Sequence, residues 1–291
     1  MRCVWYFHKG LLLVAGSLFS GEYYCTDKCE ISRSDIDLLY IGKPKLFPFS
    51  NLTKIMTKLE HYCGVKKFDH ISLRHICPET FNEYPAWMTN SWIPALVYYS
   101  TNISVLQLPA TILRPRPINF EETVEAIDFA WLYAVLELTK LPVLRVSSYI
   151  AAKLLLVVGA VFCQRHRRWF NCYRDIVTNL SDLQYVSRNA LEISYQVKVG
   201  KTLDLKDENI ADLLVTARNI TEALLPQRRI HCVQSTWHLI ETLCEAGPVL
   251  KLRYRHIIGK QILSRMKALP AFELEKLHRY EAAYRILMGG N

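Results

Sequence analysis

The sequence predicts an α/β domain followed by an all-α domain, and three observations favour this fold class. Between residues 35 and 113, most apolar residues form short runs of strand length, interrupted by one stretch with helical spacing. Beyond residue 117, nearly all apolar residues recur at helical spacing. Between the two patterns, residues 114–117 read Arg-Pro-Arg-Pro, which is typical of a stiff linker. We therefore expect domains at 35–113 and 114–291, preceded by an N-terminal extension at 1–34.

The first domain is expected to begin with a strand, a helix and a second strand. Residues 36–41 read Ile-Asp-Leu-Leu-Tyr-Ile, an apolar run typical of a buried strand. The stretch 51–63 has apolar residues at helical spacing, and Asn51 or Ser50 can cap its start. Residues 67–73 alternate Phe, His and Ser with Asp, Ile and Leu, which predicts the second strand.

The remainder of the first domain is expected to form a hairpin and a helix. Residues 92–100 and 103–108 are rich in strand-forming residues and flank a Thr-Asn turn, so they predict a β-hairpin. Pro109 then opens a predicted helix in its first turn, where proline is tolerated. The expected order is β-α-β-loop-β-β-α.

The second domain is expected to be helical throughout. One helical face, on a helix that ends near Pro142, carries Val124, Ile127, Trp131, Ala134 and Leu138. Further helices are expected at 147–165, 169–180, 207–225, 234–246, 249–268 and 272–287.

Charge and cysteine content limit the classes of function. The chain has 36 Lys and Arg against 27 Asp and Glu, a formal net charge of +9, which is compatible with nucleic acid, an anionic membrane or an acidic partner. Because it has no RNA-binding signature and no zinc-finger spacing, we do not expect a nucleic-acid partner. The nine cysteines are typical of buried free thiols in a reducing compartment. Cys25 and Cys29 form no CxxC motif and have no second pair, so we expect no metal site.

Residues 1–20 resemble a secretory signal peptide. Arg2 and Lys9 precede an apolar run at 11–19. No convincing cleavage site follows, and the run is too short to span a bilayer. Whether this segment is a signal peptide stays open at the level of the sequence.

A second apolar stretch, residues 146–163, approaches the length of a membrane span. Lys153 interrupts it, and a cation at a bilayer centre is costly. We therefore expect a buried core helix whose end is the basic cluster Arg-His-Arg-Arg-Trp at 165–169; a segment that dips into the membrane is the alternative. The side chains expected in the core are Leu154, Leu155, Val158 and Val161.

Three segments of the first domain resemble landmarks of glutathione transferases. Those enzymes have a Pro-Phe loop after the first strand, a cis-proline before a later strand, and a Val-Leu-x-Glu-Ser segment that opens the third helix. This chain has Phe-Pro-Phe-Ser at 47–50, Ile-Pro-Ala-Leu at 93–96 and Val-Leu-Gln-Leu-Pro at 105–109. The resemblance implies a thioredoxin-like domain and a transferase-like helical domain. It also implies that Pro94 follows a cis bond and precedes a central strand of a four-stranded mixed sheet.

The residues that carry transferase chemistry are replaced at these landmarks. Phe47 stands at the nucleophile position and has no thiol or hydroxyl to activate. Ser50 stands at the position of the resolving cysteine. Leu108 and Pro109 replace the Glu-Ser pair that binds the γ-glutamyl end of glutathione. We therefore expect no catalytic, cofactor-binding or metal-binding residues and no glutathione binding; the alternative is a glutathione-dependent transferase that uses Tyr40 at the end of its first strand.

A transferase-like chain without that chemistry resembles the metaxin group. Residues 126–144, 195–225 and 269–287 are similar to helices of the metaxin helical domain. The resemblance implies a pseudoenzyme: a non-catalytic subunit of the mitochondrial outer-membrane machinery for protein import and β-barrel assembly. Such a subunit would be membrane-associated on the cytosolic face, held by protein subunits of the assembly complex with peripheral membrane contact. A secreted or endoplasmic-reticulum adaptor with the same fold stays open as the alternative, if residues 1–20 are a signal peptide.

Overall fold

The computed structural model divides into two compact units, which are described separately. Unit 1 comprises Met1–Thr123, Gly159–Asp182 and Tyr195–Leu203, and unit 2 comprises Val124–Val158, Leu183–Ser194 and Asp204–Asn291. Within these units the structure describes residues 4–7, 10–23, 35–42, 70–76, 81–104, 106–139, 148–202 and 205–225.

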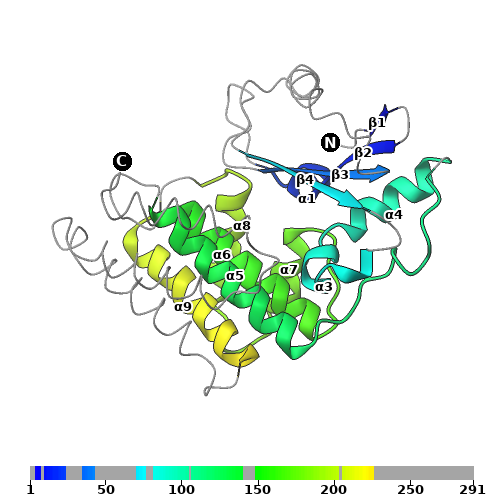
Figure 1. The fold of residues 1–291 in the computed structure, drawn as a ribbon. Coiled ribbons are helices and arrows are strands. Elements are labelled where there is room, and N and C mark those ends of the chain that lie inside the picture. Colours follow the sequence, from blue (N-terminus) through cyan, green and yellow to red (C-terminus); the bar gives the residue numbers. More distant parts are fainter. Residues whose placement is uncertain are drawn as a thin grey trace, which may run out of the picture. The chain divides into compact units, whose positions relative to one another are not determined.

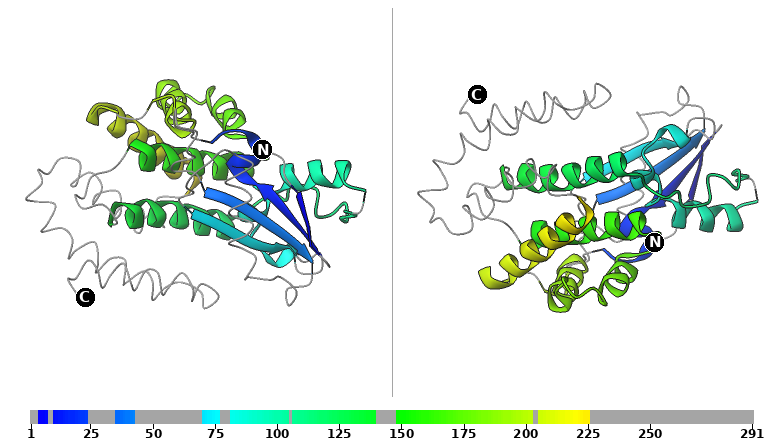
Figure 2. Two further views of the ribbon diagram at one scale, coloured as in Figure 1. Left: turned by 90° about the horizontal axis from the view of Figure 1, so that it is seen from above. Right: turned by 90° about the horizontal axis from the view of Figure 1, so that it is seen from below.

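Unit 1 contains a mixed four-stranded sheet (Figure 1). The strands are β1 (Val4–Phe7), β2 (Gly10–Ala15), β3 (Asp35–Gly42) and β4 (His70–Ile76), in the order β1-β2-β3-β4. β2 is antiparallel to both β1 and β3, whereas β3 and β4 are parallel. The strands lie side by side in both views of Figure 2. Residues 11–15 are all buried, because an inner strand covered on both faces accommodates a continuous apolar run.

Both strands predicted for the start of the first domain are present. β3 covers the predicted strand 36–41, and β4 overlaps the predicted strand 67–73 but begins and ends later in the chain. The predicted helix 51–63 lies outside the described residues.

The antiparallel part of the sheet comes from a different segment than predicted. The hairpin β1–β2 completes the sheet with residues that we expected in an N-terminal extension. The predicted hairpin at 92–108 is wrong, because residues Ile93–Asn102 form helix α4. The predicted cis-proline is also wrong: no described peptide bond is cis, so Pro94 follows a trans bond and opens a helix, and no central strand follows it.

Two features of residues 93–102 explain why they form a helix and not a strand: the position of Pro94 and the spacing of the buried side chains. Pro94 lies in its first turn, where a missing N–H breaks no intrahelical bond. Ile93, Leu96 and Tyr99 are all buried. A helix places these three side chains near one another on one side, whereas a strand would divide them between the two faces of a sheet. Burial therefore overrides the strand propensity of the Val-Tyr-Tyr sequence that follows Leu96.

The described residues from 106 to 119 form no helix, so the predicted helix from Pro109 is wrong. The segment contains a turn in which Ile112 N donates to Pro109 O at 2.9 Å. Pro115 and Pro117 follow closely, and each lacks an N–H and keeps the preceding residue out of the helical region. A helix that started at Pro109 would have to end before Pro115, which leaves too few residues for a stable helix.

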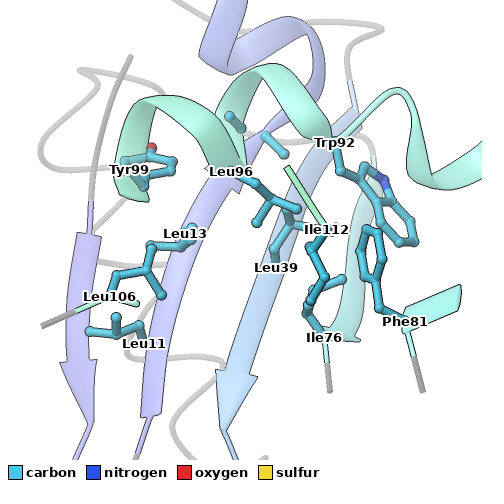
Figure 3. Close-up of a cluster of buried hydrophobic side chains, with 12 residues drawn as sticks. Leu11, Leu13, Leu39, Ile76, Phe81, Trp92, Leu96, Tyr99, Leu106 and Ile112 are labelled. Atoms are coloured by element: carbon cyan, nitrogen blue, oxygen red, sulfur yellow. The ribbon is translucent and has the colours of Figure 1, made fainter. Parts of the chain in front are cut away.

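The core of unit 1 lies between the sheet and α4 (Figure 3). Leu13 and Leu39 of the sheet cluster with Leu96 and Tyr99 of α4. Trp92 extends this cluster onto the 3-10 helix Phe81–Glu83, where the rings of Trp92 and Phe81 meet edge to face with centroids 6.4 Å apart. A short helix, α3 (Ala86–Thr89), follows the 3-10 helix.

Later segments of the chain also belong to unit 1. The end of α6 (Ser148–Arg165) packs closely on α7 (Tyr173–Leu180): a Cβ on Gly159 would lie 2.7 Å from Leu180 Cδ1 and 3.1 Å from Ile176 Cγ2. Any larger residue at position 159 would therefore have to displace the Leu180 side chain.

Unit 2 contains most of α5 (Phe120–Thr139), the first part of α6, and α9 (Asp207–Leu224). Trp131 Nε1 of α5 donates to Thr221 Oγ1 of α9 at 3.2 Å, and both side chains are fully buried. Ser148 Oγ accepts a bond from Leu205 N at 3.0 Å. These polar contacts join segments that are far apart in the sequence.

The helix predictions for the second domain have mixed outcomes. α6 and α9 match the predicted helices 147–165 and 207–225 closely, and α7 begins later than the predicted 169. Helix α8 (Arg188–Lys198) was not predicted. The prediction that α6 is a buried core helix is confirmed for its named side chains Leu154, Leu155, Val158 and Val161. The predicted helices 234–246, 249–268 and 272–287 lie outside the described residues.

Candidate functional site

Tyr40, the residue that the alternative glutathione-dependent transferase would use, is buried in the sheet. It lies in β3 and is 2% exposed. Its cross-strand partner is Leu12 of β2, so Gly10 is its diagonal neighbour on the same face. A Cβ on Gly10 would lie 2.6 Å from Tyr40 Oη, which means that the tyrosine ring covers the glycine. Its hydroxyl therefore lies in the packed interior, where a dissolved thiol cannot reach it.

Those of the other transferase-like positions that the structure describes do not form a site. Phe47 and Ser50 lie outside the described residues. Pro94 is half-buried in α4, Leu108 packs against the core of unit 1, and Pro109 is exposed in a turn. The described landmark residues thus have packing roles or lie on the surface.

The two described cysteines are free thiols with raised pKa values. Cys163 is buried and Cys172 is half-buried, and both are free, as the sequence predicts. Burial raises the pKa of Cys163 to about 12 and that of Cys172 to about 11. Neither side chain is a thiolate at neutral pH, and the thiolate is the form that attacks electrophiles or binds metals. The described part of the chain also holds no cluster of three or more His, Cys, Asp or Glu side chains that could bind a metal.

A buried carboxylate that sequence reasoning missed, Glu22, caps a distant helix. Glu22 is 6% exposed and follows Gly21, which ends helix α1 (Gly16–Ser20). It accepts bonds from Tyr173 N at 2.5 Å and from Arg174 N at 2.9 Å. These N–H groups begin α7, whose own N-cap residue, Cys172, makes no side-chain capping bond. A carboxylate suits this place because it satisfies free N–H groups and the positive end of the helix dipole.

A polar network fixes the segment before α5. Asn90 and the backbone of Arg116 exchange two bonds, at 2.8 and 2.9 Å, and Asn90 Nδ2 also donates to Gln164 Oε1 at 3.0 Å. The Arg116 guanidinium donates to the carbonyl oxygens of Asn82 and Tyr84 at 3.1 and 2.7 Å. These bonds join the Arg-Pro-Arg-Pro segment to residues 82–90 and to the end of α6.

The end of α6 presents an exposed cationic surface, which we call the basic turn and define as residues 165–169. Every residue of the basic turn is exposed. Arg165 Nη1 donates to Ile118 O at 3.1 Å, and Arg168 Nη1 donates to Asn179 O at 2.5 Å. The His166 ring stacks on Phe162 with centroids 4.2 Å apart. Partial desolvation of the His166 ring, followed by the charges of Arg168 and Arg165, lowers the pKa of this exposed residue, so its side chain is mostly neutral at neutral pH.

Comparisons with known proteins identify no relative of this chain. No family model, no curated protein and no solved structure matches the chain significantly. Among the described helices, α6 is the one that is long and apolar enough to cross a membrane, and most of its length is buried inside the structure.

Proposed function

We propose that this chain is a non-catalytic binding subunit that works at a membrane surface. In its specific form, the proposal is a metaxin-like subunit of the mitochondrial outer-membrane machinery for protein import and β-barrel assembly, on the cytosolic face. The specific form rests on the sequence resemblances at 126–144, 195–225 and 269–287. The trans bond before Pro94 and the helix α4 depart from the thioredoxin-like domain that the resemblance implies, so that domain does not support the specific form.

The observation that carries the non-catalytic part is the burial of Tyr40. Its 2% exposure and its packing over Gly10 argue against the alternative of a glutathione-dependent transferase, which needs that hydroxyl beside a bound thiol. The raised pKa values of Cys163 and Cys172 argue in the same direction, because neither thiol provides a nucleophile.

The peripheral part of the proposal is supported by α6. Its apolar side chains Leu154, Leu155 and Val158 are at most 3% exposed, so they already have protein neighbours. A helix whose apolar surface is satisfied in this way gains little by entering lipid, and membrane attachment then depends on surface contacts and on protein partners.

Subcellular fractionation of cells that express the tagged protein tests this function. We expect the tag to sediment with mitochondrial outer membranes, to be digested by protease added to intact mitochondria, and to co-purify with β-barrel assembly subunits. Depletion should slow the assembly of newly imported β-barrel proteins. If the tagged protein instead enters the secretory pathway and the cell cleaves off residues 1–20, the alternative of a secreted or endoplasmic-reticulum adaptor would be supported.

A further inference from the structure

The backbone of the basic turn is held in a defined shape. Arg168 N donates to Cys163 O at 2.8 Å, and Arg167 N donates to Gln164 O at 3.2 Å. These are the two bonds of the Schellman motif, which ends helices by satisfying their last carbonyl groups. These bonds define the backbone conformation of the basic turn, and therefore the positions of the Cα atoms that carry its side chains.

Arg167 occupies a backbone position that favours glycine. Its φ is 57°, and it is the one non-glycine residue with positive φ in the described parts of the chain. Helices usually place glycine here, because a side chain in the left-handed region is disfavoured. Helix-dipole stabilisation explains cations near the end of α6, but it does not require an arginine at this particular residue. An arginine at a backbone position that favours glycine points to a use for its side chain.

The positive charge of the basic turn is not neutralised by nearby carboxylates. Both Arg165 and Arg168 bond to uncharged carbonyl oxygens. In the part of the chain that the structure describes, Arg165, Arg167 and Arg168 form no ion pair. The three guanidinium groups of the turn are therefore not compensated by a carboxylate among the described residues, although those of Arg165 and Arg168 each also bond one backbone carbonyl oxygen.

An exposed indole completes this surface. Trp169 is 41% exposed and directly follows Arg168. Tryptophan is enriched at the membrane–water interface, where its apolar ring and its N–H both find suitable surroundings. Arginine side chains reach phosphate groups from the same depth.

The form of the surface distinguishes between the anionic partners. A peptide is usually held in a groove or along a strand edge, whereas the basic turn is a run of consecutive exposed residues. Single-stranded nucleic acid is bound along a basic groove with successive aromatic platforms, and this turn carries a single exposed tryptophan. An exposed turn with cations next to one tryptophan fits a plane of lipid headgroups best.

We propose that the basic turn binds the surface of an anionic phospholipid bilayer, with Arg165, Arg167 and Arg168 against headgroup phosphates and Trp169 among the headgroups. The proposal rests on the proposed function at a membrane surface, and it assigns the lipid-contacting residues and the class of lipid.

Vesicle sedimentation of the purified full-length protein tests the proposal. We expect binding to vesicles of phosphatidylcholine mixed with phosphatidylserine, weakening with added salt, and much weaker binding to phosphatidylcholine alone. Free inorganic phosphate should compete no better than chloride at matched ionic strength, because the turn is proposed to contact several headgroups of a bilayer surface at once and not to hold a single phosphate ion.

Arg167→Gly separates the role of the side chain from the stability of the turn. The glycine removes one cation and relieves the left-handed backbone, so vesicle affinity should fall about fivefold while the melting temperature rises. Arg167→Lys should keep most of the affinity. Lys201→Gln removes the same charge from another exposed position and should change vesicle affinity less than Arg167→Gly does.

Two results would overturn the proposal. One is equal vesicle affinity of Arg167→Gly and the unchanged protein. The other is tighter binding to a single-stranded oligonucleotide than to vesicles, lost in the same variant, which would assign the turn to nucleic acid. The proposed function fails separately: anionic vesicle binding by a protein that fractionates away from mitochondria would keep this inference and remove the mitochondrial role.

Discussion

At the scale of single residues, burial decides which chemistry a side chain can perform. Tyr40 has a hydroxyl that could activate a thiol in an open pocket, but its side chain is buried and its ring packs over Gly10. Cys163 could act as a nucleophile as a thiolate, but burial raises its pKa to about 12. Arg167 shows the reverse case, since its side chain is exposed. Sequence patterns identify these residue types but do not contain their exposure.

The first residue-scale prediction concerns glutathione. Leu108 and Pro109 offer no carboxylate or hydroxyl to its γ-glutamyl end, and a ligand with unpaired polar groups loses about 1–3 kcal/mol for each group. We expect no submillimolar binding in calorimetry and no capture on glutathione resin. Tyr40→Phe should leave any measured conjugation rate at background; a transferase rate that this variant abolishes would establish the enzyme.

A second residue-scale prediction concerns the titration of His166. Burial and the charges of Arg168 and Arg165 lower its pKa below 6.5. Near that pH the unfolded chain binds more protons than the folded chain, so this residue's contribution to stability is complete above about pH 6.5 and falls as the pH drops toward the lowered pKa. NMR titration should find the lowered pKa, and Arg168→Gln should raise it. A pKa of His166 at or above 6.5 in the folded protein would contradict the uncompensated charge of the turn and the partial desolvation of the His166 ring.

At the scale of elements, the sequence predicts long periodic helices well and short segments poorly. The bounds of α6 and α9 follow from extended apolar patterns. The segment 92–108 was misread because Val, Tyr and Ile favour strands, while contacts with the sheet select a helix. Residues 10–15 resemble the apolar part of a signal peptide, and only their pairing with β3 distinguishes a strand from it. The Glu22 cap joins groups 151 residues apart, and no local pattern contains it.

The first element-scale prediction compares Gly16, the first residue of α1, with Gly21, which directly follows its last residue. Gly16 and Gly21 have φ of +63° and +81°, so alanine is strained at both by about 1–2 kcal/mol. At Gly16 a Cβ would also collide with the Asp37 carboxylate, whereas at Gly21 it would meet open space. Gly16→Ala should therefore lower the free energy of unfolding by more than Gly21→Ala. Equal losses in urea titrations would contradict the packing of α1 against β3.

The second element-scale prediction concerns the Glu22 cap. In Glu22→Gln only one side-chain oxygen remains as an acceptor, and the charge at the helix N-terminus is lost. We expect the free energy of unfolding to fall by about 1–2 kcal/mol. Glu222→Gln is the matched control, because it removes the same charge from an exposed ion pair with Arg218 and should cost at most about 0.5 kcal/mol. A loss for Glu22→Gln no greater than that of the control would mean that the cap does not form in solution.

At the scale of the whole molecule, the N-terminal residues belong to the fold. β2 is an inner strand, and β1 and β2 complete the antiparallel half of the sheet. If residues 1–20 were removed as a signal peptide, β3 would lose its antiparallel partner and the buried side chains of residues 11–15 would leave the core.

We therefore predict that the mature protein retains residues 4–15. Mass spectrometry of the N-terminal peptide from cells should detect them, and a variant that starts at residue 21 should be insoluble or degraded. A folded, abundant protein that lacks these residues would contradict the sheet and would favour the secretory alternative.

The central claim is that the protein works as a peripheral subunit, held at a membrane by its surfaces. Alkaline carbonate extraction of membranes that carry the protein tests this claim most directly, because it releases peripheral proteins and leaves integral ones in the pellet. We predict sedimentation with membranes at neutral pH and release into the supernatant after carbonate treatment, since the apolar side chains of α6 are buried in protein. Retention in the carbonate pellet, also in a variant that lacks residues 1–20, would place α6 in the bilayer and contradict the account.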